Sequence, residues 1–120
     1  MATAIKKNFD SPENVLTIPN GNVDIVKLGE LTAVRSTFNP GWKWSESVKP
    51  SAHTDSCQIH HIGYQVAGRL HVILNDRSEI EYGPGDVYDI PPGHDAWVLG
   101  SEAVVMVDFR VAETQTTPQK

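Results

Sequence analysis

The residues of this chain that could do chemistry lie in two short runs of the sequence. The first run contains the only thiol, Cys57, followed by two adjacent imidazoles, His60 and His61. The second run contains a further imidazole, His94, directly after a Pro-Pro-Gly sequence. Thiolate and imidazole are ligands that bind zinc, copper or iron better than magnesium or calcium. The two runs together therefore indicate a site for a divalent transition metal.

The alternation of side chains along a strand decides which of these groups can share one face. In an extended chain Cys57, His61 and Gln65 point one way, and His60 points the other way. Adjacent histidines cannot both line one pocket unless the strand bulges. We therefore select Cys57, His61 and His94 as the metal ligands, with zinc, iron, copper, nickel or manganese as the ion. Gln65 is a poor metal ligand, but its amide can hydrogen-bond a bound carboxylate or water.

Each of these side chains also has an ordinary structural interpretation. Free cysteine is among the most buried residue types, so Cys57 could be a small core hydrophobe. His94 precedes Asp95, and a histidine in a loop could simply hydrogen-bond that carboxylate. His53 and His71 are assigned to the surface or to local hydrogen bonds, and they receive no role in the site.

The three tryptophans, Trp42, Trp44 and Trp97, each lie beside an expected strand of the pocket. Ligand sites are usually apolar clefts with a few polar groups, so we expect a pocket lined by Trp44, Gln65 and Trp97. The alternative is core packing, in which an aromatic side chain buries roughly 150–250 Å².

The elements that must position these residues are short strands. An Asn-Gly step, Asn20-Gly21, joins two apolar runs and predicts a β-hairpin. Further runs of strand character have no helical period, which predicts an all-β sandwich or barrel. These runs cover residues 31–38, 69–74, 80–82, 87–90, 96–99 and 103–111. Residues 1–14 are expected to form an N-terminal arm, residues 15–111 the barrel, and residues 112–120 a disordered tail.

The spacing of glycine and proline near the second run resembles a motif of the cupin family. Gly85, Pro91 and Gly93 match the frame of the second cupin motif, and Gly68 resembles the end of the first. The resemblance implies a jelly-roll β-barrel whose internal pocket holds a metal through three histidines and one glutamate. This sequence departs from that ligand set, because His61 stands where the family has glutamate.

Three longer runs resemble one cupin subgroup of small stand-alone bacterial proteins, whose modules also occur fused to regulatory domains. These runs are Pro40-Gly41-Trp42-Lys43-Trp44-Ser45, Cys57 to Tyr64, and Pro91 to Val98. Ala96 stands where the family has its last histidine, and His94 lies two residues earlier on the same face of an extended segment.

Composition limits the partners and the compartment. Fifteen acidic and ten basic residues give a formal charge of −5, which argues against nucleic acid as a partner. One cysteine cannot form an internal disulfide, and we see no signal-peptide core or membrane-spanning run, so we expect a cytoplasmic protein without membrane contact. Edge strands favour pairing, and we expect a homodimer in which the N-terminal arm crosses the partner.

The sequence leaves two classes of function open. The first is an enzyme whose metal acts as a Lewis acid on a small oxygenated substrate while a histidine moves protons. The second is a small-molecule sensor without catalysis, which the incomplete family ligand set and the tryptophan-rich pocket favour. A storage module that binds a carbohydrate or an acid is a third, weaker alternative.

Overall fold

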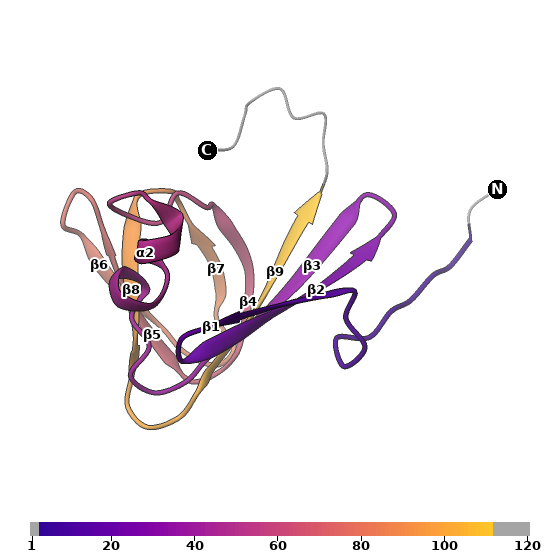
Figure 1. The fold of residues 1–120 in the computed structure, drawn as a ribbon, viewed down its shortest axis with the longest axis horizontal. Coiled ribbons are helices and arrows are strands. Elements are labelled where there is room, and N and C mark those ends of the chain that lie inside the picture. The colour runs from indigo at the N-terminus through magenta and orange to yellow at the C-terminus, as the bar shows by residue number, and fades with distance from the viewer. Residues whose placement is uncertain (1–2, 112–120) are drawn as a thin grey trace.

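The structure, a computed structural model, describes residues 3–111, so the expected tail lies outside the described residues (Figure 1). This part of the chain contains nine strands and two one-turn helices. The strands are β1 (Asn14–Ile18), β2 (Gly21–Leu28), β3 (Leu31–Phe38), β4 (His61–Ala67), β5 (Arg69–Leu74), β6 (Glu79–Tyr82), β7 (Val87–Ile90), β8 (His94–Leu99) and β9 (Val104–Val111). The helices are α1 (Trp44–Ser47) and α2 (Lys49–Ala52).

The strands form two antiparallel sheets that face each other, which confirms the all-β jelly-roll fold. One sheet has the order β1-β2-β3-β9-β4-β7, and the other has the order β6-β5-β8. Buried residues from both sheets pack into a single core, including Leu70 and Val72 of β5 and Val104 and Met106 of β9. Beyond this core, β2, β3 and the end of β9 continue away from the smaller sheet (Figure 1).

The expected hairpin at the start of the chain is confirmed. Asn20 has φ 65°, a conformation that asparagine tolerates, and Ile18 pairs with Gly21 across the turn. The hairpin places β1 at the edge of the larger sheet, where its inward side chains extend the apolar wall made by β2 and β3.

Trp42, Lys43 and Trp44 do not form one extended segment. Lys43 bridges Trp97 as a strand residue would, but α1 begins at Trp44. Pro50 lies in the first turn of α2, where a backbone N–H has no partner within the helix. Each helix is a single turn, too short to produce a period in the sequence. Among the described residues, no helix has the length and apolar character needed to cross a membrane.

The described part of the N-terminal arm contacts its own chain. The guanidinium of Arg35 on β3 lies 5.2 Å from the centre of the Phe9 ring, and the amide of Glu13 donates to Ile25 of β2 at 3.0 Å. The homodimer stays a prediction.

Candidate metal centre

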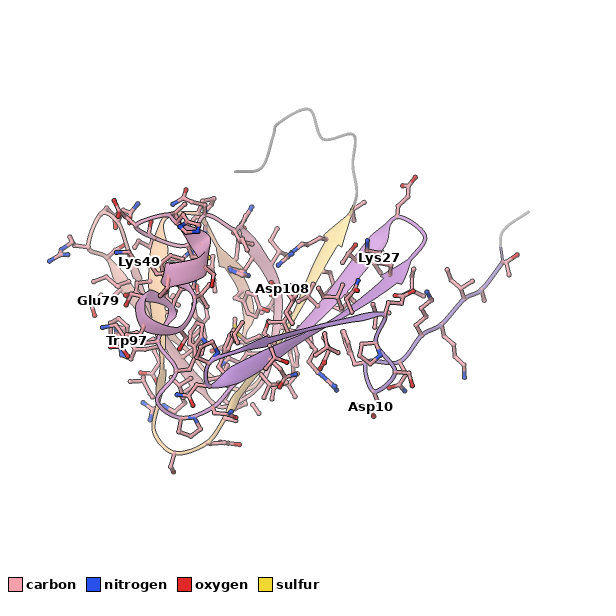
Figure 2. All side chains as sticks on the ribbon, in the orientation of Figure 1. Asp10, Lys27, Lys49, Glu79, Trp97 and Asp108 are labelled. Carbon is pink, nitrogen blue, oxygen red and sulfur yellow. The ribbon has the colours of Figure 1, made fainter. Side chains whose placement is uncertain are left out.

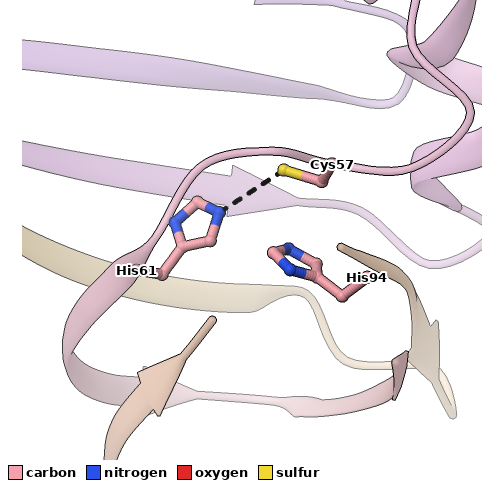
Figure 3. A group of neighbouring side chains, drawn as sticks. All are labelled: Cys57, His61 and His94. Carbon is pink, nitrogen blue, oxygen red and sulfur yellow. Dashed lines mark hydrogen bonds between the residues drawn. The ribbon is translucent and has the colours of Figure 1, made fainter. Parts of the chain in front are cut away.

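Three side chains from separate segments converge at one end of the core, and they are the three selected from the sequence. The ligand atoms of Cys57, His61 and His94 all lie within 4.8 Å of one another. Cys57 Sγ is 3.7 Å from His61 Nε2, and the two imidazole centres are 5.3 Å apart (Figure 3). Figure 3 shows the thiol and both rings pointing toward a common point.

The backbone fixes Cys57 opposite His94 through a short bridge. The amide of Cys57 donates to the carbonyl of His94 at 2.7 Å, and the amide of Gly93 donates to the carbonyl of Cys57 at 2.7 Å. Gly93 has φ 92°, and a Cβ at this position would lie 2.7 Å from the side chain of Asn75. Gly93 therefore has a backbone conformation that favours glycine. This turn directs His94 into the core.

Each histidine is anchored through Nδ1, which leaves its Nε2 available. His61 Nδ1 donates to a carboxylate oxygen of Asp108 at 2.6 Å, and His94 Nδ1 donates to the carbonyl of Pro91 at 2.7 Å. Histidines that bind metals almost always donate their other ring N–H to a carboxylate or a carbonyl in this way. With the thiol of Cys57, the site offers one sulfur and two nitrogens. This donor set fits zinc, copper or iron, and three ligands leave a fourth position open in a tetrahedral site.

Asp108 is the buried carboxylate behind the site, and it lies within the body of the molecule (Figure 2). Besides His61, its oxygens accept hydrogen bonds from the hydroxyl of Tyr88 and from Arg110 Nη2, the latter at 3.2 Å. Gly63 leaves room for this arrangement, because a Cβ there would lie 2.8 Å from the Tyr88 hydroxyl oxygen and would also strike the backbone of β9. A glycine on β4 thus allows Tyr88 to reach Asp108.

The hydrogen bonds of the site outweigh burial in setting the charges. Burial alone would raise the pKa of Cys57, but hydrogen bonds from His61 and His94 lower this pKa to about 6. Burial alone would lower the pKa of His61, but hydrogen bonds to Asp108 and Cys57 raise it to about 9. Burial and the Asp108 carboxylate raise the pKa of Tyr88, so this phenol stays a hydrogen-bond donor. At neutral pH the thiol is therefore ready to act as a thiolate, the form that binds metals.

A cavity of about 250 Å³ opens beside the three side chains. Most of its wall is apolar, and one part of it comes from the inward faces of β1, β2 and β3 through Leu16, Ile18, Val23, Ile25, Val34 and Phe38. Trp44 lines the cavity as expected, and Trp42 lines it as well. The candidate ligands, Asp108 and Arg110 gather in another part of the lining, supplied by the segment at Cys57 and by β4, β8 and β9.

Two of the expected pocket residues lie outside the cavity lining. On β8 the buried side chains are His94, Ala96 and Val98, so Trp97 points outward, where its ring stacks on His71 at 4.7 Å between centroids (Figure 2). Gln65 does face inward, but it lies farther along β4 than His61. Its amide nitrogen donates to the carbonyl of Gly68 at 3.0 Å, inside the closed core.

The other imidazoles occupy the places that alternation predicts. His60 points away from His61 and contacts Asp89 at 2.5 Å on the surface. His71 contacts Glu79 at 2.6 Å, also outside the cavity. The sequence-based reasoning did not single out Tyr88, and it gave Asp108 and Arg110 no function. The only indication in the sequence was that Asp108 and Arg110 fall on the same face of the last strand.

The comparisons with known proteins find similarity in structure. No family model and no curated protein matches the sequence. KdgF from Halomonas sp. is similar with a TM-score of 0.61 and 22% identity, over 97% of this chain and 100% of that one. The polyketide cyclase RemF from Streptomyces resistomycificus has a TM-score of 0.64 and 14% identity, over 92% of this chain and 81% of that one. The Cnp3 cupin domain from Schizosaccharomyces pombe has a TM-score of 0.59 and 17% identity, over 84% and 69% of the two chains. At these identities the likeness shows a common fold.

Proposed function

Because the chain has the cupin fold, we propose that it binds one divalent transition-metal ion and acts on a small organic molecule in the adjoining cavity. One observation carries this proposal. The Nε2 atoms of His61 and His94 converge with the thiol of Cys57, while both Nδ1 atoms are already anchored. These Nδ1 contacts fix the orientation of both rings, so that both Nε2 atoms and the thiol can face one ion at the same time.

The residues of the site have different roles. Cys57, His61 and His94 would hold the ion, and Asp108 fixes the ring orientation and the tautomer of His61. When bound, such an ion polarises an oxygen of the substrate or lowers the pKa of a bound water. Sulfur and imidazole donors favour zinc, copper, iron or nickel over manganese, which prefers oxygen. The apolar side chains of the lining suit the carbon skeleton of a small organic molecule.

A sensor that binds a ligand without turnover is the second candidate, and one observation favours it. The carboxylate of Asp108 already accepts three hydrogen bonds, so it is not a free general base. Apart from the candidate ligands and Asp108, the described residues of the lining add only Ser36 and Arg110 as charged or hydroxyl-bearing side chains. Mass spectrometry of metal-loaded protein mixed with extracted small metabolites distinguishes the two functions. A ligand that is consumed supports an enzyme, and a ligand that is retained unchanged supports a sensor.

Metal uptake tests the proposal directly. Untagged protein is dialysed against a chelator, and zinc is added back in a calorimetric titration. We expect one equivalent to bind to the parent, no stoichiometric uptake by His61→Ala or His94→Ala, and weaker uptake by Cys57→Ser. His71→Ala is the matched control, because this histidine lies outside the cavity, and it should bind as the parent does. A parent without uptake, or a His61→Ala variant equal to the parent, contradicts the proposal.

A further inference from the structure

The polar groups of the cavity gather in one part of its lining. The inward faces of β1, β2 and β3 contribute mainly apolar side chains, including Leu16, Ile18 and Phe38. The candidate ligands, Asp108 and Arg110 come from the segment at Cys57 and from β4, β8 and β9. A ligand that matches both parts of the lining has an apolar body and a polar group at one end.

Arg110 is the permanent cation among the described residues of this lining. Its side chain is 42% exposed, and one nitrogen of the guanidinium contacts Asp108 at 3.2 Å. A guanidinium has five N–H donors in a fork that matches a carboxylate, so one such contact leaves most of this capacity unused. The half-exposed position keeps the guanidinium accessible from the cavity.

A shared carboxylate oxygen places Arg110 next to the candidate metal centre. Oδ2 of Asp108 accepts from His61 Nδ1 at 2.6 Å and from Arg110 Nη2 at 3.2 Å. His61 and Arg110 both line the cavity, so the imidazole and the guanidinium are close neighbours there. One end of a small ligand can therefore reach Arg110 and the open coordination position together.

The balance of charge also favours an anion. A bound divalent ion and Arg110 are positive, whereas the Cys57 thiolate and the Asp108 carboxylate are negative, and imidazole ligands are neutral. The loaded cavity would thus carry one uncompensated positive charge. In an apolar cavity that charge attracts an anion more strongly than it would in water.

We propose, resting on the function proposed above, that the ligand is a small carboxylate with an apolar body, anchored by Arg110. The carboxylate lies on the side of Arg110 and His61, and the body lies along the wall made by Leu16, Ile18 and Phe38. The cavity of about 250 Å³ falls below the range of roughly 300–1,000 Å³ typical of sites for drug-sized ligands, so the ligand is small.

Matched acids and amides test this assignment. The probes are isobutyrate, benzoate and phenylacetate, each compared with its uncharged amide of the same shape. Binding to zinc-loaded protein is followed by tryptophan fluorescence, since Trp42 and Trp44 line the cavity. We expect at least one acid to bind about tenfold or more tightly than its amide, because a charge-assisted fork contact is lost in the amide.

Two arginine variants identify the anchor. Arg110→Gln should lower the affinity for the acid by about tenfold and leave that for the amide unchanged. Arg69→Gln is the matched control, because Arg69 contacts Glu81 outside the cavity, and it should retain the preference of the parent. Arg110→Gln should still take up one equivalent of zinc, because it keeps Cys57, His61 and His94.

The outcomes separate this inference from the proposed function. A parent that takes up zinc but binds no acid better than its amide overturns the carboxylate assignment and leaves the metal site standing. The same holds if Arg110→Gln keeps the full preference. If the parent takes up no zinc, the acid and amide titrations on metal-free protein still test Arg110, and loss of the preference in Arg110→Gln supports the anchor alone.

Discussion

Replacing Asp108 by asparagine should weaken metal binding although Asp108 does not itself contact the ion. The substitution keeps the size and shape of the side chain but exchanges one carboxylate oxygen for an NH2 group. In the parent, one oxygen accepts from His61 Nδ1 at 2.6 Å, and the other accepts from the hydroxyl of Tyr88. An asparagine amide can accept from only one of these two donors at its oxygen.

The size of the effect follows from these contacts. Removing the partner that orients a metal-binding histidine typically costs about 10–100-fold in metal affinity, or about 1.4–2.8 kcal/mol. Asp108 is 3% exposed, so the donor that faces the new NH2 group, from either His61 or Tyr88, is buried without a hydrogen-bond acceptor. That loss costs about 1–3 kcal/mol of folding free energy. The melting temperature of the metal-free variant should therefore fall by several degrees.

Two assays separate metal affinity from folding stability. Competition with a chromophoric zinc chelator gives the affinity, and thermal unfolding of metal-free protein gives the stability. Tyr88→Phe is the matched control, because it removes one hydrogen bond to Asp108 but keeps the contact between His61 and the carboxylate. This variant should lose about 0.5–1.5 kcal/mol of stability and retain the zinc affinity of the parent.

The pair of variants can refute the reasoning. If Asp108→Asn binds zinc as tightly as the parent, Asp108 does not orient His61 for a metal. If Tyr88→Phe and Asp108→Asn lose zinc affinity equally, the loss reflects disturbed packing around the carboxylate.

Three further predictions concern the turn, the thiol and the assembly. Gly93→Val should lower the free energy of unfolding by about 1–3 kcal/mol, because φ 92° strains a branched side chain. Gly83→Ala is the control, because a Cβ at this position meets open space. Equal melting temperatures for the two variants contradict the prediction. In metal-free protein the thiolate absorbance of Cys57 should rise as pH increases through about 6, because hydrogen bonds from His61 and His94 lower the pKa despite burial. A midpoint near 9.0, the ordinary value for a thiol, contradicts this. Tyr64 on the outer face of β4 is 44% exposed. We expect analytical sedimentation to show a homodimer of the parent that Tyr64→Glu dissociates. A monomeric parent contradicts this prediction.

Strand periodicity predicted which face each side chain of β4 occupies. His61, Gly63 and Gln65 point inward and Tyr64 points outward, as the period of two requires. The same rule applied to β8 would have shown that Trp97 faces away from His94. The period of two predicts the face on which a side chain lies, but it does not predict how far along the strand the cavity extends. Gln65 therefore faces the core but lies outside the cavity.

The partners of the site could not be predicted, because they depend on the order of strands in the sheet. Asp108 reaches His61 only because β9 lies next to β4, and these strands are far apart in the sequence. Tyr88 arrives from β7 on the other side of β4. The helix at Trp44 was missed for a different reason. A single helical turn is stabilised by its surroundings and leaves no periodic signal.

Anomalous diffraction from crystals grown with zinc tests the central claim most directly. The metal-binding account predicts one strong peak bonded to Cys57 Sγ at about 2.3 Å and to the Nε2 atoms of His61 and His94 at about 2.0–2.1 Å. The Nδ1 atoms should keep their contacts with Asp108 and Pro91. A peak at surface pairs such as His60 and Asp89, or no ordered peak between the three side chains, would contradict the account.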